Sequence, residues 1–156
     1  MRQWYELNEI NHELLKFAVL IAKYNNQFII INNKKRGGWE VPGGTREIGE
    51  TILYTASREL YEETGAVRFG LTPFGIYQLN ESFGMVFFAE VEEMSTLPGF
   101  EIEEIKFEDD LPEGMNFGDL FYDLYARWNE RKDKKLEKYA IDIRNLDKVN
   151  ERVILV

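Results

Sequence analysis

The chain has 156 residues, a formal net charge of −9, no cysteine and one histidine, His12. This length suffices for one domain with its own core, and one domain spanning 1–156 is expected. The composition excludes disulfides, cysteine nucleophiles and Cys-ligated zinc, and it argues against a histidine metal cluster or a catalytic triad. The acidic balance argues against DNA binding, because nucleic-acid binders normally carry a basic surface. Acid–base chemistry is therefore expected from carboxylates.

The N-terminal segment, residues 1–15, is expected to be an extension of the domain. The sequence contains no apolar run of about eighteen residues, which is the length that a membrane span needs. Glu6, Asn8 and Glu9 interrupt the start of the chain, so it does not resemble a signal peptide. The protein is therefore expected to be cytoplasmic and not bound to a membrane.

A β-hairpin is the first regular structure that the sequence predicts. The segment KFAVLIAKYNNQFIIINN reads as two apolar, β-branched strands around a polar turn at residues 24–27. Asn25 and Asn26 in that turn tolerate unusual backbone angles. A loop follows, marked by Gly37-Gly38 and Pro42-Gly43-Gly44.

The remaining elements alternate between helix and strand. A helix is predicted over residues 51–64, closed by Gly65, followed by strands in FGLTPFGIYQL and GMVFFAEV. The acidic segment from Glu92 to Glu113 is expected to be a solvated surface. A C-terminal helix is predicted over 117–139, where Leu120, Leu124 and Trp128 recur at four-residue spacing. The tail, 140–156, ends in RVILV, a candidate edge strand. This mixed order predicts an α/β (mixed α+β) layered fold.

Three glutamates on the first predicted helix form a carboxylate cluster. Glu59, Glu62 and Glu63 lie at i, i+3 and i+4, so they share one face. Like charges at this spacing repel by about 0.2 to 0.5 kcal/mol per pair on an exposed helix. A divalent cation would offset that repulsion, and oxygen ligands suit Mg²⁺, with Mn²⁺ as a substitute. The alternative is a solubilising surface on which Arg58 pairs with Glu62.

The residues around this cluster resemble the signature of the Nudix family. The signature is Gly, five residues, Glu, seven residues, then Arg-Glu-apolar-any-Glu-Glu-any-Gly-apolar. The matching positions are Gly44, Glu50, Arg58, Glu59, Leu60, Glu62, Glu63, Gly65 and Ala66. Ala66 is smaller than the usual Ile, Leu or Val at the last position, although Val67 follows it. The solubilising alternative does not account for so complete a match.

The resemblance implies a fold and a set of roles. The fold would be the Nudix-type α/β/α sandwich with a mixed central sheet, in which residues 43–66 form the loop-helix-loop. The helix glutamates would bind divalent cations, with the backbone carbonyl of Gly43 as a further ligand. Arg58 and Glu50 would form a structural ion pair, although Glu50 also suits the positive end of the helix dipole. The predicted catalytic set is Glu59, Glu62, Glu63, Arg58 and Glu50.

The general base and the last metal ligand stay open between several acids. Many family members carry one more acid from a later strand or loop, and Glu104 is the candidate for it. Glu101 and Glu103 are close rivals, and a solvated acidic loop is the alternative. Glu62 or Glu63 is the first choice for the base, with Glu104 second.

Residues 39–44, Trp-Glu-Val-Pro-Gly-Gly, also resemble the MutT-type branch of the family. That likeness implies a nucleotide-like substrate, in particular a nucleoside triphosphate, including oxidised purines, cut to monophosphate and pyrophosphate. Lys34, Lys35 and Arg36 suggest phosphate contacts, and solvated hairpin charges are an equal alternative. The predicted substrate-binding set is Arg36, Trp39, Glu40, Gly44, Phe87 and Asn116.

Asn116 and Phe87 each have a simpler interpretation. In the MutT-type branch an asparagine just before the last helix can read a purine edge, but Asn116 also suits a helix N-cap. Phe87 or its neighbour Phe88 could stack on a base, but two phenylalanines in a strand more often belong to the core.

Other substrates and a non-enzymatic function are the alternatives. The same chemistry would cut ADP-ribose, a nucleotide sugar or a capped RNA end. A catalytically silent nucleotide-binding module of the same fold is the alternative of another class, although such modules usually have a degraded signature. The terminal strands also leave a homodimer open.

Overall fold

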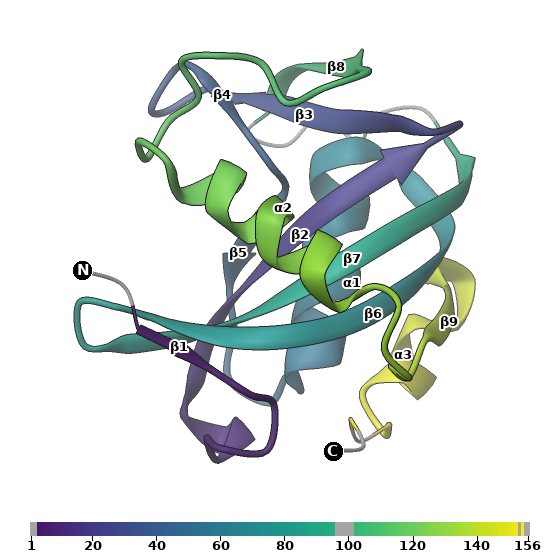
Figure 1. Ribbon diagram of the computed structural model, residues 1–156. Coiled ribbons are helices and arrows are strands. Elements are labelled where there is room, and N and C mark those ends of the chain that lie inside the picture. The colour runs from purple at the N-terminus through teal and green to yellow at the C-terminus, as the bar shows by residue number, and fades with distance from the viewer. Residues whose placement is uncertain (1–2, 96–101, 153, 155–156) are drawn as a thin grey trace.

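A computed structural model describes residues 3–95, 102–152 and 154. Strands and helices follow one another in mixed order (Figure 1). The strands are β1 (Gln3–Tyr5), β2 (Leu15–Tyr24), β3 (Gln27–Asn33), β4 (Trp39–Glu40), β5 (Gly43–Thr45), β6 (Ala66–Leu79), β7 (Ser82–Met94), β8 (Ile102–Glu108) and β9 (Tyr139–Asp142). The helices are α1 (Ile52–Thr64), α2 (Leu120–Arg131) and α3 (Leu146–Val149), with 3-10 helices η1 (His12–Leu14) and η2 (Ile143–Asn145).

These strands form one mixed sheet. Its main path runs β1-β6-β7-β2-β3-β4, while β5 pairs with β2, β8 with β3 and β9 with β6. Strands β2 and β7 run parallel, and the other described pairings are antiparallel. The pairing of β5 with β2 fixes Gly43 and Gly44 against a central strand of the sheet.

One main helix covers each face of the sheet, α1 behind it and α2 in front of it in Figure 1. Successive residues of a strand point to opposite faces, so β2 contributes to both cores. Leu20 packs in the same buried cluster as Leu60 of α1, and Ile21 packs with Leu124 of α2. This arrangement confirms the predicted fold class, a mixed α/β/α sandwich.

The two adjacent phenylalanines of β7 belong to these cores. Phe87 is fully buried in the cluster on the α1 side. Phe88 packs on the α2 side, with its ring stacked on Trp128 at 4.2 Å between centroids. The prediction that Phe87 stacks on a base is therefore wrong, because its ring has no surface open to a ligand.

The predicted hairpin and first helix are confirmed. Asn25 and Asn26 adopt left-handed φ angles of 50° and 64° in the turn between β2 and β3. At the start of α1 the hydroxyl of Thr51 accepts a hydrogen bond from the N–H of Tyr54 at 3.2 Å. Gly65 ends the helix in the left-handed conformation, φ 81°. Local turn and capping chemistry thus fixed both elements.

The C-terminal helix is shorter than the predicted span of 117–139. It covers Leu120–Arg131. It cannot begin at residue 117, because Phe117 and Gly118 have positive φ angles, which a right-handed helix does not allow. Tyr139 lies in the edge strand β9, which pairs with β6. Among the described residues, none of the helices is long and apolar enough to cross a membrane.

Three other segments differ in how they meet the expectations. None of the acidic segment's residues whose side chains are described is buried, in keeping with a solvated surface, and the segment also contains the strand β8, which pairs with β3. The N-terminal extension contributes β1, which pairs with β6. Of the candidate edge strand RVILV, Arg152 and Ile154 are described and are not in a strand, and Ile154 is buried in the core on the α1 side; the other three residues lie outside the described part of the chain.

Candidate functional site

The helix α1 separates its apolar side chains from its acidic ones. Leu53 and Leu60 are fully buried against the sheet. Glu59, Glu62 and Glu63 lie at the spacing that places them on another side of the helix. The carboxylate of Glu63 lies against Gly43 of β5, and that of Glu59 lies against Gly44. The strand and the helix together therefore form the site.

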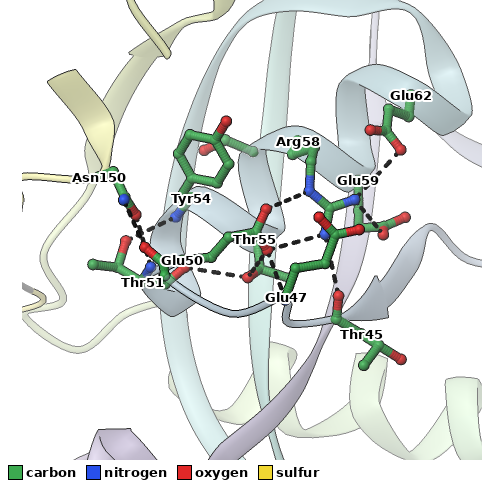
Figure 2. Close-up of polar contacts among 12 residues, drawn as sticks. Thr45, Glu47, Glu50, Thr51, Tyr54, Thr55, Arg58, Glu59, Glu62 and Asn150 are labelled. Carbon is green, nitrogen blue, oxygen red and sulfur yellow. Dashed lines mark hydrogen bonds and ion pairs between the residues drawn. The ribbon is translucent and has the colours of Figure 1, made fainter. Parts of the chain in front are cut away.

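Arg58 ties α1 to the loop that precedes it (Figure 2). Its Nε and Nη2 donate to the two carboxylate oxygens of Glu50 at 2.6 and 3.0 Å, and Nη2 also donates to the carbonyl of Thr45 at 3.1 Å. The hydroxyl of Thr55 and the N–H of Glu47 donate to Glu50 as well. Burial alone would raise the pKa of Glu50, but these hydrogen bonds outweigh burial and lower it. The expected Arg58–Glu50 ion pair is present.

Glu59 lies between Arg58 and Gly44. Its Oε1 accepts from Nη1 of Arg58 at 2.7 Å, and the same nitrogen lies 3.4 Å from Oε2 of Glu62. A Cβ atom on Gly44 would come within 2.2 Å of the Glu59 carboxylate carbon, so a larger residue there would displace the Glu59 carboxylate. Burial raises the pKa of Glu59 to about 7, although the hydrogen bond from Arg58 opposes this. The hydrogen bond to Glu50, in turn, raises the pKa of Arg58.

Glu63 is held by the backbone of Gly43. The N–H of Gly43 donates to Oε1 of Glu63 at 2.7 Å. Burial raises the pKa of Glu63 to about 9, with the hydrogen bond from Gly43 acting against it and the charges of Glu59 and Glu40 adding to it. Two partly buried carboxylates thus lie beside two consecutive glycines, where the main chain can approach a ligand closely.

The carboxylates are turned toward protein partners rather than toward a common point. In the part of the chain that the structure describes, no three His, Asp or Glu side chains converge to enclose an ion. The reason is local, since Glu59 bonds Arg58 and Glu63 bonds Gly43. The oxygen donors suit a hard divalent cation, and holding one would require these side chains to rotate.

An apolar cleft with a volume of about 250 Å³ opens beside Gly43 and Gly44. Its lining includes four aromatic side chains that lie far apart in the sequence: Phe17, Tyr77, Phe117 and Phe121. Phe17 and Tyr77 meet edge to face there, with ring centroids 5.3 Å apart. The cleft can therefore take a flat, apolar group next to the carboxylates.

Phe117 is the most exposed aromatic side chain of this cleft. It is half exposed, and its backbone φ of 67° is unusual for a bulky residue and therefore strained. Its ring lies edge to face with Phe121 at 5.9 Å, and the guanidinium of Arg36 lies 5.3 Å from its centroid. The sequence analysis missed this residue because it took Phe117 for the start of a helix.

Arg36, Glu40 and Asn116 form one hydrogen-bonded group at the cleft. Nε and Nη2 of Arg36 each donate to the buried carboxylate of Glu40 at 2.8 Å. The amide of Asn116 donates to Glu40 at 2.7 Å and to the carbonyl of Gly37 at 2.6 Å. Arg36 and Glu40 line the cleft. Asn116 joins two loops, and the suggestion that it is a helix N-cap is wrong, because Asp119 has that position.

The two remaining predicted site residues lie on the β3 side of the sheet. Trp39 pairs with Asn32 of β3, and its ring lies under the ammonium of Lys106 at 4.4 Å. Glu104 is an exposed residue of β8, and its Oε1 lies 3.5 Å from the amide nitrogen of Asn32. The rival Glu103 is also part of β8, and Glu101 lies outside the described residues. Glu104 thus comes from a different element than the three acids of α1.

A second residue that the sequence analysis missed is Asn150. Its side chain reaches the loop before α1 and makes hydrogen bonds there (Figure 2). It follows the short helix α3, far from the loop in sequence, so no local pattern indicated the contact.

Comparison with known families and structures gives one consistent result. The sequence model of the NUDIX domain matches residues 14–125. A search of curated proteins found no match. The pyrophosphohydrolase BsRppH of Bacillus subtilis is similar in structure, with a TM-score of 0.72 at 20% identity, covering 86% of this chain and 93% of that one.

Two further solved structures show the same fold. A NUDIX hydrolase from Nitrosomonas europaea has a TM-score of 0.64 at 24% identity, covering 83% of this chain and 78% of its own. An ADP-ribose pyrophosphatase from Streptococcus suis has a TM-score of 0.58 at 15% identity, covering 76% and 92%. At these identities the likeness concerns the fold.

Proposed function

Because the chain belongs to the Nudix hydrolase family, we propose that it cuts a phosphoanhydride bond in a nucleoside diphosphate-linked compound with the help of Mg²⁺. The proposed substrate is a nucleoside triphosphate, including oxidised purines, and the products are a monophosphate and pyrophosphate. One observation carries the proposal: Glu63 and Glu59 of α1 lie against Gly43 and Gly44, and an apolar cleft opens beside the same glycines.

The residues at the glycines fit a divalent cation in their chemistry. Glu59, Glu62 and Glu63 would hold it, together with the carbonyl of Gly43, and all of these donors are oxygens. The missing Cβ of Gly44 leaves room against the Glu59 carboxylate. A bound Mg²⁺ would supply the positive charge that offsets the negative charge on the diphosphate during attack.

The chain's own groups position the reaction and take up its proton. Water attacks a phosphorus atom, the bridging P–O bond breaks, and a glutamate accepts the proton of the water. Glu62 and Glu63 are the candidates for this acceptor. The side chain of Glu62 is 30% exposed and open to water, whereas Glu63 is mostly buried and already accepts from Gly43. Arg58 contributes by holding Glu50 and Glu59 in place.

The cleft would take the base of the nucleotide. Its aromatic walls suit a flat ring, and Arg36 and Glu40 offer a donor and an acceptor at its edge. Phe117 replaces Phe87 in this proposal as the side chain that contacts the base. The exposed Lys34 and Lys35 would contact the phosphates, and Trp39 and Asn116 would support the loops around the substrate.

A Mg²⁺-dependent hydrolysis screen with product identification tests the function. The panel contains canonical and oxidised nucleoside triphosphates, ADP-ribose, nucleotide sugars, capped RNA and dinucleoside polyphosphates. Release of pyrophosphate from triphosphates is the expected result. Production of two monophosphates from ADP-ribose, with triphosphates left intact, would overturn the substrate assignment but leave the reaction class standing. Tight nucleotide binding by Mg²⁺-loaded protein without any cleavage would instead make it a binding module.

A further inference from the structure

The side chain of Asn150 makes hydrogen bonds to the main chain on both sides of Glu50. Its Oδ1 accepts a hydrogen bond from the N–H of Thr51, and its Nδ2 donates to the carbonyl of Gly49, each at 2.8 Å (Figure 2). These two backbone groups belong to the residues immediately before and after Glu50. One amide side chain therefore fixes the main chain on either side of this carboxylate.

Glu50 is the first of a series of contacts that leads to the carboxylates of α1. It binds Arg58 through two hydrogen bonds, and Arg58 binds Glu59 at 2.7 Å. The carboxylate of Glu59 then lies against Gly44. The backbone at Gly49 has a φ of 86°, so this loop adopts a conformation that most residues avoid. A displacement of the loop would therefore be passed to Glu59 through Arg58.

The segment that carries Asn150 is anchored independently of the loop. Val149 and Ile154 on either side of it are buried in the same core cluster as Ile52 and Leu53 of α1. Upstream, β9 pairs with β6. The match to the NUDIX domain ends at residue 125, so this C-terminal segment lies beyond it. The packed C-terminal segment therefore holds the Asn150 amide in a fixed position against the loop before α1.

We propose that Asn150 is a positioning residue for the catalytic carboxylates, and that the C-terminal segment from β9 to α3 serves to hold it against the Glu50 loop. The activity part of this inference rests on the proposed function, whereas the geometric part does not. It predicts that loss of the amide loosens the Glu50–Arg58 pair and lowers turnover, without lowering the affinity for the substrate's base.

The test compares Asn150→Ala with two control variants. Ile30→Ala removes buried apolar volume on the α2 side of the sheet and leaves the segment of Asn150 unchanged, so it lowers stability alone. Asn145→Ala changes an exposed asparagine of the same segment. Hydrogen exchange at the Arg58 Nε–H, followed by NMR in the metal-free protein, reports directly on the pair with Glu50. In Asn150→Ala this exchange should become about tenfold faster, whereas both controls should match the wild type.

Kinetics and a partial variant provide the second readout. At saturating Mg²⁺, Asn150→Ala should lower kcat about tenfold with KM changed less than about twofold, as expected for a residue that orients another. Asn150→Asp, which keeps an acceptor for Thr51 but loses the donor to Gly49, should lie between. Exchange at Arg58 that is equal in Asn150→Ala and Ile30→Ala would overturn the inference, since Asn150 would then be a stabilising residue alone. A wild-type protein without turnover would contradict the proposed function but leave the NMR comparison decisive.

Discussion

The two faces of the sheet contribute opposite chemistry to one site. On the α1 side, buried charged groups are fixed by short hydrogen bonds, as between Arg58 and Glu50. On the α2 side, an apolar cleft is lined by loops and by aromatic rings such as Phe117, which is half exposed. The first region comes from one continuous stretch of about two dozen residues. The second is assembled from segments that lie far apart in the sequence.

This difference between the two faces suggests that one face serves the reaction and the other serves the choice of substrate. In the proposed function, the carboxylates on the α1 side would hold the cation that binds the diphosphate, whatever group is attached to it. The cleft would select the attached group. Changes on the α1 side should therefore act on turnover and stability, and changes in the cleft should act on KM. The predictions that follow test this division.

The largest effect is expected for the glutamates of α1. Of Glu62→Gln and Glu63→Gln, the variant that removes the proton acceptor should lower kcat about a thousandfold, while the remaining oxygen ligands still bind Mg²⁺. The substitution keeps the shape of the side chain and removes its capacity to accept a proton. Steady-state kinetics combined with calorimetric Mg²⁺ titration measures both quantities.

A matched control is Glu92→Gln. Glu92 is an exposed acid of β7 that pairs with Arg68, and its variant should keep full turnover. If Glu62→Gln, Glu63→Gln and Glu104→Gln all kept full turnover, the carboxylate mechanism would be wrong.

Arg58→Ala should cause the next largest effect, on stability. Both partners of the Arg58–Glu50 pair are mostly buried, so removing one should lower the free energy of unfolding by about 3 kcal/mol. Arg144→Ala is the control, because Arg144 makes a similar pair with Asp142 on the surface. Chemical denaturation should show little change for that variant. Equal losses in the two variants would contradict the role assigned to burial.

The same contrast explains what the sequence could predict. The spacing of Glu59, Glu62 and Glu63 and the caps of α1 are local properties, so the helix and its acidic face followed from them. The role of Phe117 depends on a left-handed backbone and on Arg36 from another loop, and neither has a local signal. Asn150 acts across about a hundred residues of sequence, and its contact depends on how the C-terminal segment packs.

The stability of the metal-free protein should depend on pH through Glu63. Its pKa rises from 4.5 to about 9 on folding, so between these values the folded state holds a proton that the unfolded state has lost. The free energy of unfolding should therefore fall as pH rises through this window, by at most about 1.4 kcal/mol per pH unit for this group. Denaturation in EDTA across the window measures the slope.

Two comparisons identify the source of that slope. The charged neighbours of Glu63 are Glu59, Glu40 and Arg36. Glu63→Gln removes the titrating group, so the free energy of unfolding should depend less on pH, with the contribution of Glu59 left. Added Mg²⁺ should also flatten the pH dependence, since a cation favours the ionised carboxylates. A metal-free protein that becomes more stable as pH rises through the window would contradict the shift.

The smallest effect is expected in the cleft. Phe117→Ala should raise KM for a purine triphosphate about tenfold and leave kcat nearly unchanged, because base–aromatic stacking contributes about 1 to 3 kcal/mol per base. The loss should be smaller for a pyrimidine triphosphate, whose ring offers less area. Phe107→Ala is the control, because Phe107 is also an exposed phenylalanine but lies on β8 against Tyr24. It should leave both constants unchanged. A fall in kcat at unchanged KM in Phe117→Ala would instead show that the cleft takes part in the reaction step, and the division between the two faces would not hold.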